Sequence, residues 1–180
     1  QDGAARQLWG IDRIRDRDTM PKTLIITEGE IDSASVAQVV PASTAVCSVP
    51  NGAPAKVSQN KVTAEEDTKF HYLWAAKDVL EAVDEIILAT DNDSPGQALK
   101  EEVARRSGRA KCKEITFPED CKDLNEVLMK HGSEALSEII TNAKHMPLEG
   151  VYQAKEYLDS VKELYDQGLV TGFSTGISAL

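Results

Sequence analysis

The chain has 180 residues, 41% hydrophobic and 28% charged, which is the composition of a soluble globular protein with one domain of ordinary size and a buried core. Its net charge of −10 argues against a surface built only to grip nucleic-acid phosphate, but leaves a metal-bridged nucleic-acid enzyme open. No apolar run approaches the roughly 18–20 residues of a membrane helix, and no signal peptide opens the sequence. We therefore expect a cytoplasmic protein with no membrane partner.

In chain order, residues 1–21 come first and mix arginines and aspartates without clear periodicity. They are either a solvated, loosely ordered lead-in or the tail end of an upstream domain. Short apolar runs then predict four strands, at residues 22–27, 44–49, 85–90 and 111–117. Helical patterns lie between and after them, at 33–39, 63–83 (opened by a capping box at 63–66), 95–106, 123–131 and 133–142. This alternation predicts an α/β fold with a mainly parallel four-stranded sheet flanked by helices.

The pattern changes after Met146-Pro147. One amphipathic helix is predicted from about Leu148 to Gln167, with apolar residues at Val151, Ala154, Leu158, Val161, Leu164 and Tyr165. A single helix at the end of a compact domain either packs back on its own sheet or serves as a linker that docks on a neighbouring subunit. The sequence leaves both arrangements open.

Three cysteines, Cys47, Cys112 and Cys121, form no CxxC pair. Their odd number and their spacing argue against both a disulfide framework and a structural zinc site. We therefore expect buried thiols in a reducing compartment, and no zinc in this chain.

The segment Asp91-Asn92-Asp93-Ser94-Pro95-Gly96 directly follows the third predicted strand. Ser94 and Pro95 are typical of an N-cap and a first helical residue, and Gly96 of a tight turn. The two aspartates stand at i and i+2 of extended chain and therefore point to the same side. This places two carboxylates at the carboxyl end of a central strand, where open α/β sheets keep their sites.

The ends of three predicted strands carry six carboxylates, which are Glu28, Glu30, Asp32, Asp91, Asp93 and Asp123. In a parallel sheet all six lie at one edge, and they cannot all stay ionised without protons or cations. Mg²⁺ suits such oxygen ligands and keeps waters for substrate phosphates, and two such ions suit in-line phosphoryl transfer. Single acids at these positions are often only helix caps. Three acidic motifs in succession, each behind an apolar run, favour a site instead.

These motifs resemble the TOPRIM domain, which is shared by DnaG-type primases, type IA and II topoisomerases, OLD-family nucleases and RecR-like repair proteins. The family pattern is a glutamate after the first strand and a D-x-D pair after a later one, and it matches Glu28, Asp91 and Asp93. Three sequence segments look most like those of phage-type primase-helicases and their Twinkle-like mitochondrial relative. They are LIITEGEID (24–32), IILATDNDSPG (86–96) and KDLNE (122–126).

The resemblance covers about residues 22–145, and GFSTGI at 172–177 looks like the opening of a RecA-like helicase domain. It implies a lead-in from a truncated N-terminal primase subdomain (1–21), a Rossmannoid TOPRIM domain (22–146), a linker helix (147–168) and the truncated start of a helicase domain (169–180). No P-loop and no zinc-ribbon cysteines are present, so we expect neither NTP-driven unwinding nor template reading from these residues alone.

The resemblance also assigns roles to single residues. The metal ligands that it implies, for one or two Mg²⁺ or Mn²⁺ ions, are Glu28, Asp32, Asp91, Asp93 and Asp123. Glu28 is alternatively the general base for the attacking 3′-hydroxyl, and with Asp91 and Asp93 it forms the implied catalytic set. Glu30, Lys122 and Asn125 are secondary candidates. Lys122 and Asn125 either steady Asp123 or a phosphate, or are only a helix start with a solvated lysine.

The function implied is that of a Mg²⁺-dependent DNA primase module, a nucleotidyltransferase that makes RNA primers on single-stranded DNA during replication. The implied partners are the DNA template, nucleoside triphosphates and a helicase domain in cis within a ring oligomer, in a bacterial or phage-infected host. Two alternatives stay open: another TOPRIM phosphotransfer enzyme, such as a nuclease or topoisomerase, and a degenerate TOPRIM scaffold of a replicative helicase. A receiver domain is disfavoured, because Asp93 and a helix start follow Asp91.

Overall fold

The computed structural model describes residues 7–53, 69–148, 150–151 and 157–167. The chain divides into two compact units, residues 1–146 and 147–180, and each is described by itself. Among the described residues, no helix has both the length and the apolar content needed to cross a membrane.

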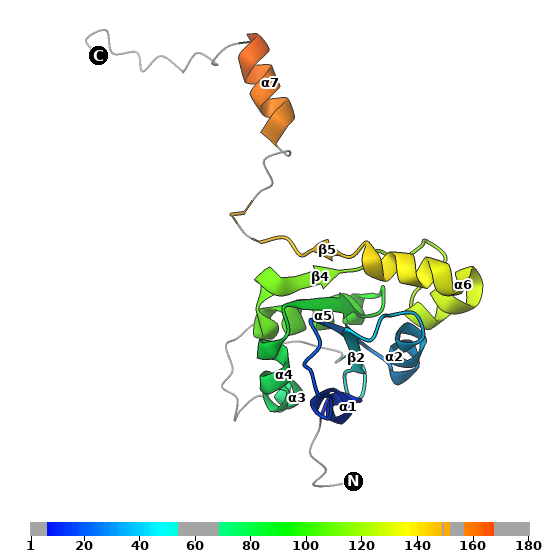
Figure 1. Cartoon of the computed structure of the whole chain (residues 1–180). Coiled ribbons are helices and arrows are strands. Elements are labelled where there is room, and N and C mark those ends of the chain that lie inside the picture. The colour runs from blue at the N-terminus through cyan, green and yellow to red at the C-terminus, as the bar shows by residue number, and fades with distance from the viewer. Residues whose placement is uncertain (1–6, 54–68, 149, 152–156, 168–180) are drawn as a thin grey trace. The chain divides into compact units, whose positions relative to one another are not determined.

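One five-stranded sheet forms the centre of the first unit, in the order β2-β1-β3-β4-β5 (Figure 1). The strands are β1 (Thr23–Thr27), β2 (Thr44–Ser48), β3 (Glu85–Ala89), β4 (Cys112–Glu114) and β5 (Lys144–His145). The first four are parallel, and β5 pairs with β4 in the antiparallel direction. The predicted α/β fold with a mainly parallel sheet is confirmed, with β5 as one strand more than the sequence predicted.

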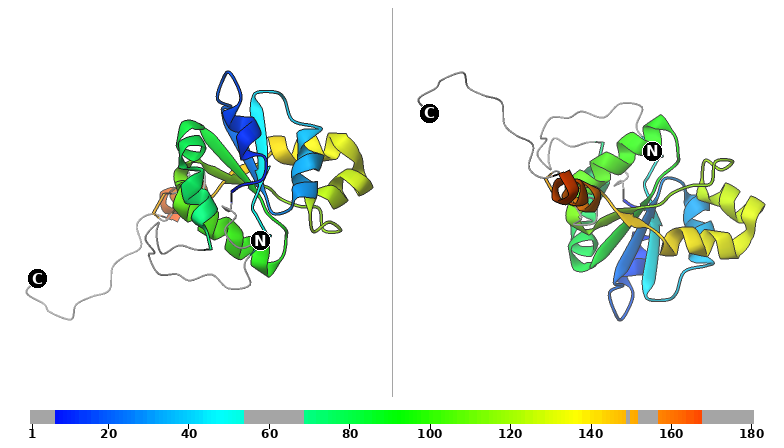
Figure 2. Two further views of the ribbon diagram at one scale, coloured as in Figure 1. Left: turned by 90° about the horizontal axis from the view of Figure 1, so that it is seen from below. Right: turned by 90° about the horizontal axis from the view of Figure 1, so that it is seen from above.

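Helices cover both faces of this sheet, and Figure 2 shows α2 and α6 together on one side and α3, α4 and α5 on the other. Their bounds are α1 (Ile11–Arg15), α2 (Glu30–Ala37), α3 (His71–Ala75), α4 (Lys77–Ala82), α5 (Ser94–Ser107) and α6 (Leu124–Thr141). Alternate residues of the strands enter two different core clusters, so that Leu24 and Ile26 pack with α1, α3, α4 and α5. Ile25 and Ile87 pack with α2 and α6. Burial on both faces explains why the strands read as continuous apolar runs.

Part of the N-terminal segment is packed into the core. Leu8, Ile11 and Ile14 are each 2% exposed, and Trp9 forms an antiparallel bridge with Ser48 of β2. The expectation of a solvated, loosely ordered lead-in is therefore wrong for these residues. Apolar side chains three residues apart form the buried face of this segment and of α1. The periodicity was not recognised in the sequence because charged residues lie between these apolar positions.

Several helix bounds differ from the prediction. The long helix expected to run to Val83 is broken into α3 and α4 at Ala76, which has φ −100° and ψ 10°, and its capping box at 63–66 lies outside the described residues. α2 begins at Glu30, three residues earlier than expected. The break predicted between residues 131 and 133 is confirmed, because Gly132 inside α6 has φ 84° and ψ 178°.

The fourth predicted strand and the C-terminal helix are both shorter than expected. A 3₁₀ turn, η1 (Arg109–Lys111), precedes β4, and the chain leaves the sheet after Glu114. In the second unit, α7 (Leu158–Gln167) replaces the helix predicted from Leu148. Gly150 has φ 76°, a left-handed conformation that does not continue a helix. The predicted start of a helicase domain, 169–180, lies outside the described residues.

Candidate functional site

The carboxyl ends of three strands lie level at one edge of the sheet. Thr27, the last residue of β1, pairs with Ser48 of β2 and with Ala89 of β3. Glu28 and Asp91 therefore leave the sheet at the same edge, from neighbouring parallel strands. β3 is the central strand, so the predicted position of the Asp91 segment is confirmed.

Asp91 lies half-buried among four other acids. Its pKa is raised to about 7, first by burial and then by the nearby carboxylates of Glu28, Asp32, Asp123 and Asp93. These five carboxyl groups are called the acidic cluster below. The expectation that acids from separate motifs would gather at one edge is met by these five residues.

Glu30 is not among the carboxylates that raise the pKa of Asp91. It is the first residue of α2 and is exposed, and among the described residues its carboxylate makes no hydrogen bond or ion pair. The sequence grouped it with the other acids because it lies between Glu28 and Asp32. In the structure α2 begins at residue 30, and the placement of Glu30 in the site stays a prediction.

Glu28 is held by a loop that the sequence did not implicate. Its Oε1 accepts a hydrogen bond of 2.9 Å from the Ala53 backbone N–H, whereas its Oε2 is buried with no hydrogen-bond partner among the described residues. Asn51 and Gly52 reach this position with positive φ angles of 65° and 67°. The Pro50-Asn51-Gly52 turn was the available signal, but nothing local linked it to Glu28.

Asp32 joins α2 to α6. Its Oδ1 accepts the Asn125 backbone N–H at 2.9 Å, and the Asn125 side-chain Oδ1 accepts from Ser35 Oγ at 3.2 Å. Burial raises the pKa of Asp32, as do the charges of Asp123 and Glu28, while the N–H groups of Asn125 and Leu124 act against the shift. Asn125 therefore contacts Asp32 directly, and its expected role in steadying Asp123 or a phosphate stays a prediction.

Asp93 and Asp123 each cap a helix. Asp93 Oδ1 accepts from the Gly96 N–H and Asp123 Oδ1 from the Glu126 N–H, both at 2.7 Å. The N-cap of α5 is thus Asp93 and not Ser94 as predicted, because Asp93 is extended (φ −125°, ψ 175°) while Ser94 is already helical. Each cap uses one oxygen and leaves Oδ2 for another partner. Lys122 Nζ lies 3.8 Å from Asp123 Oδ2, on a side chain that is 69% exposed.

A tight turn fixes the position of Asp91. A Cβ atom added to Gly96 would lie 2.2 Å from the Asp91 carbonyl oxygen, so only glycine fits there. Thr90 Oγ1 donates to the Gly96 carbonyl at 2.8 Å, and the Asn92 N–H donates to the Lys122 carbonyl at 2.8 Å. The loops that carry Asp91 and Asp123 are therefore tied together by backbone hydrogen bonding.

Comparisons with known proteins agree on one family. A family described as Toprim-like matches residues 25–128. The chain is 41% identical over 180 residues to the "Twinkle homolog protein, chloroplastic/mitochondrial" of Arabidopsis thaliana, covering 95% of this chain and 24% of the relative. It is 42% identical over 149 residues to the "Primase homolog protein" of the same plant, covering 79% of this chain and 42% of that one. The chain thus spans less than half of either relative.

The fold is also similar to solved primase domains. One matching chain, with a TM-score of 0.54, comes from a structure of bacteriophage T7 lagging-strand DNA polymerase. That structure also contains primase domains of two gp4 subunits bound to an RNA/DNA hybrid and dTTP. The two sequences are 25% identical, over 70% of this chain and 57% of the other. The structural likeness and the sequence relatives point to the same group of replication proteins.

Proposed function

Because this chain belongs to the Toprim-like family, we propose that it is the Mg²⁺-binding catalytic module of a primase or primase-helicase, which joins ribonucleotides into primers on single-stranded DNA. The observation that carries this proposal is the acidic cluster, in which the pKa of Asp91 is raised to about 7, first by burial and then by its carboxylate neighbours. Such a cluster needs positive charge to keep its acids ionised at neutral pH.

The residues fit a hard divalent cation. Every donor in the acidic cluster is a carboxylate oxygen, which is the ligand type that Mg²⁺ and Mn²⁺ prefer. Glu28 Oε2 is buried and lacks a hydrogen-bond partner among the described residues, and a buried charged oxygen without a partner is strongly unfavourable. A cation at this oxygen would remove that penalty. Asp91 is only partly buried, so substrate phosphates could reach a cation bound there.

In the proposed mechanism the chain's own groups position the reactants. Bound Mg²⁺ would activate the attacking 3′-hydroxyl and offset charge on the leaving pyrophosphate. Asp93 and Asp123 have one oxygen fixed by a helix cap, so their second oxygens face a defined direction. Asn125 holds Asp32 through its N–H, and the Ala53 N–H orients Glu28, either as a ligand or as the base that takes the hydroxyl proton.

The wider assembly follows from the relatives and not from this chain alone. Primase domains of the T7 gp4 protein have been seen on an RNA/DNA hybrid with dTTP. By analogy, we propose that the whole protein containing this chain uses single-stranded DNA and nucleoside triphosphates, and works beside a helicase domain in cis in a ring oligomer. The net charge of −10 makes DNA contact by this chain dependent on bound cations and on other domains.

The metal site is tested by Mn²⁺ binding to this chain, measured by calorimetry and by electron paramagnetic resonance. Asp91→Asn/Asp93→Asn should weaken binding by at least about tenfold, since even indirect supports of metal ligands contribute that much. The matched control is Asp18→Asn/Asp84→Asn, which removes the same charge from exposed positions, one of them at the opposite end of β3. Equal losses in both variants would show general charge attraction and overturn the site.

The reaction is tested in the longer protein, by primer synthesis on single-stranded DNA with wild type and Asp91→Asn. Loss of primers in the variant supports the proposal. Nicking of DNA without primer synthesis would favour a nuclease, and unwinding without priming would favour a scaffold. Either of these outcomes would overturn the primase assignment while leaving the metal site intact.

A further inference from the structure

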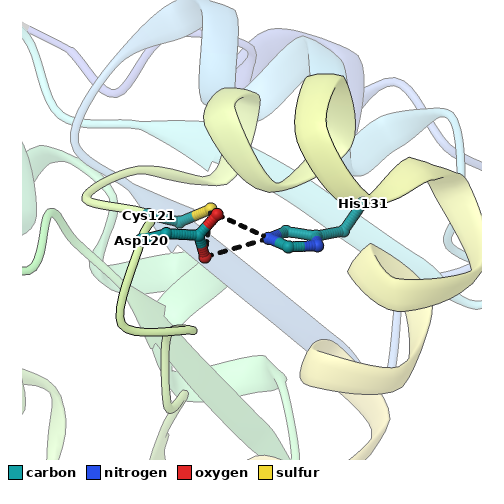
Figure 3. A group of neighbouring side chains, drawn as sticks. All are labelled: Asp120, Cys121 and His131. Atoms are coloured by element: carbon teal, nitrogen blue, oxygen red, sulfur yellow. Dashed lines mark hydrogen bonds and ion pairs between the residues drawn. The ribbon is translucent and has the colours of Figure 1, made fainter.

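A second group of metal-binding side chains lies before and within α6, outside the acidic cluster. His131 Nε2 is 3.0 Å and 3.1 Å from the two carboxylate oxygens of Asp120, and Cys121 Sγ is 3.7 Å from Asp120 Oδ1. The three ligand atoms all lie within 4.8 Å of one another. Figure 3 shows the His131 ring directed at the Asp120 carboxylate, with the Cys121 sulfur beside it.

Local structure holds the three residues in place. The Cys121 N–H donates to the Pro118 carbonyl at 3.1 Å, which closes a turn that presents Asp120 and Cys121. His131 is the last residue before the break in α6 at Gly132, and its neighbour Lys130 donates to the Asp120 carbonyl. The turn is thus already fastened to the first part of α6.

The three side chains differ in their exposure to solvent. Cys121 is 4% exposed and lies in the core cluster under α2 and α6, whereas the side chains of Asp120 and His131 are 56% and 37% exposed. An ion bound by the three residues would therefore contact the buried Cys121 thiolate on its core side and would face solvent on the side of Asp120 and His131. That arrangement leaves a coordination position for water, as in zinc sites with three protein ligands.

The distances suit a small tetrahedral ion. Zinc bonds of roughly 2.0 Å to oxygen or nitrogen and 2.3 Å to sulfur place neighbouring ligand atoms about 3.3–3.6 Å apart. The Cys121–Asp120 separation of 3.7 Å matches this, and the His131–Asp120 separation of 3.0 Å needs to widen by a few tenths of an ångström. Charge also matches, because a thiolate and a carboxylate together balance a divalent cation.

We propose that Asp120, Cys121 and His131 bind a thiophilic divalent cation of the zinc type, at a site separate from the acidic cluster. Sulfur and imidazole ligands select such ions over Mg²⁺. Zinc was not expected from the sequence because the cysteines form no CxxC pair, whereas the ligands here are two adjacent residues and a histidine ten positions later. The ion would fasten the turn to α6, and so help to fix Asp123 two residues beyond Cys121.

The test is a Co²⁺ titration of the reduced, chelator-treated chain, followed by absorption spectroscopy. A tetrahedral site with one thiolate gives a thiolate-to-cobalt charge-transfer band and visible d–d bands. Cys121→Ser should abolish the charge-transfer band. His131→Gln, at a partly exposed position that is expected to fold normally, should keep the band but weaken Co²⁺ binding by at least about tenfold.

Two controls separate this site from other cobalt binding. Cys112→Ser removes a different buried thiol and should leave the band unchanged. Asp91→Asn/Asp93→Asn should also leave it unchanged, because the acidic cluster offers no sulfur. A band that persists in Cys121→Ser, or that is absent from the wild-type chain at saturating Co²⁺, would overturn the proposal. Equal affinity of His131→Gln and wild type would do the same.

Discussion

Two groups of acidic residues in this protein have contrasting surroundings. Around α3–α5 and β4 they are paired with cations, in the ion pairs Arg15–Asp78, Lys77–Glu81, Lys100–Glu114, Arg105–Glu102, Arg106–Glu102, Arg109–Glu101 and Lys113–Glu85. In the acidic cluster, the one ion pair within the described residues joins Asp123 to the exposed Lys122 at 3.8 Å. Ion pairs therefore offset the acids around α3–α5 and β4, whereas the acids that gather at the carboxyl edge of the sheet have almost no cationic partner among the described residues.

The same contrast sets opposite pKa directions. Burial pushes the pKa of Glu102 upward, but hydrogen bonds from Arg105 and Arg106 outweigh it and hold that pKa below its usual range. Burial and four carboxylates act together on Asp91 and raise its pKa to about 7. Burial thus penalises the charged form in both regions, and the neighbouring groups decide the sign of the net pKa shift. A region that tolerates such a penalty is a candidate for function.

The largest effect is expected from Glu28→Gln, which removes the unpartnered charge but keeps the acceptor for the Ala53 N–H. Primer synthesis by the longer protein should fall by roughly 10²–10³-fold, the scale of losing one preorganised electrostatic contact. The metal-free chain should at the same time become more stable, because a buried repulsive charge is gone. Denaturant unfolding alongside primer assays measures both. Lower stability together with unchanged priming would contradict the contrast drawn here.

Gly96→Ala should cost about 1–3 kcal/mol of stability, since its Cβ would meet the Asp91 carbonyl oxygen at 2.2 Å and the backbone must move. Gly29→Ala is the matched variant, because its Cβ would meet a side-chain oxygen, Asp32 Oδ2, at 2.9 Å, and a small shift relieves this milder overlap. Urea denaturation measures the free energy of unfolding of both variants, and so compares an overlap with a backbone atom to an overlap with a side-chain atom. A Gly29→Ala loss as large as that of Gly96→Ala would show that the Asp91 turn is not specially tight.

Glu102→Gln tests the paired region, and should lower stability by about 1–3 kcal/mol because two arginines lose their charged partner. Glu81→Gln breaks the exposed pair with Lys77 and should change stability by no more than about 0.5 kcal/mol. The Glu102 contribution is present above the usual glutamate pKa and is lost as the pH falls through the lowered folded-state pKa. Thermal unfolding at several pH values measures both variants.

A further effect is the pH dependence that Asp91 imparts to the metal-free chain. The folded state holds the Asp91 proton up to about pH 7, whereas the unfolded state releases it near its ordinary pKa. Relative to Asp91→Asn, the wild type should therefore gain stability as the pH falls below about 7, which is the opposite of Glu102. Saturating Mg²⁺ should remove this dependence. A difference between the two proteins that does not vary with pH would argue that Asp91 stays ionised.

Sequence patterns predicted those features that depend on continuous apolar runs and on parallel topology. The four parallel strands and the gathering of acids at one edge follow from them, because parallel strands have their carboxyl ends at the same edge. The contacts that orient the acids were not predictable, since the Ala53–Glu28 and Asn125–Asp32 hydrogen bonds join residues 25 and 93 positions apart. β5 was missed because two residues carry no periodicity, and α1 because charged residues separate its buried positions.

The two edge strands of the sheet affect the tendency of this chain to aggregate. On one side the edge is β5, a very short strand with charged Lys144, which offers little backbone to a further strand. On the other side Trp9 covers part of β2 by exchanging two backbone hydrogen bonds with Ser48, of 2.9 Å and 3.2 Å. A shortened chain beginning at Lys22 would uncover the end of β2 and leave an apolar strand open to intermolecular pairing. Aggregation of such a chain would start at this edge.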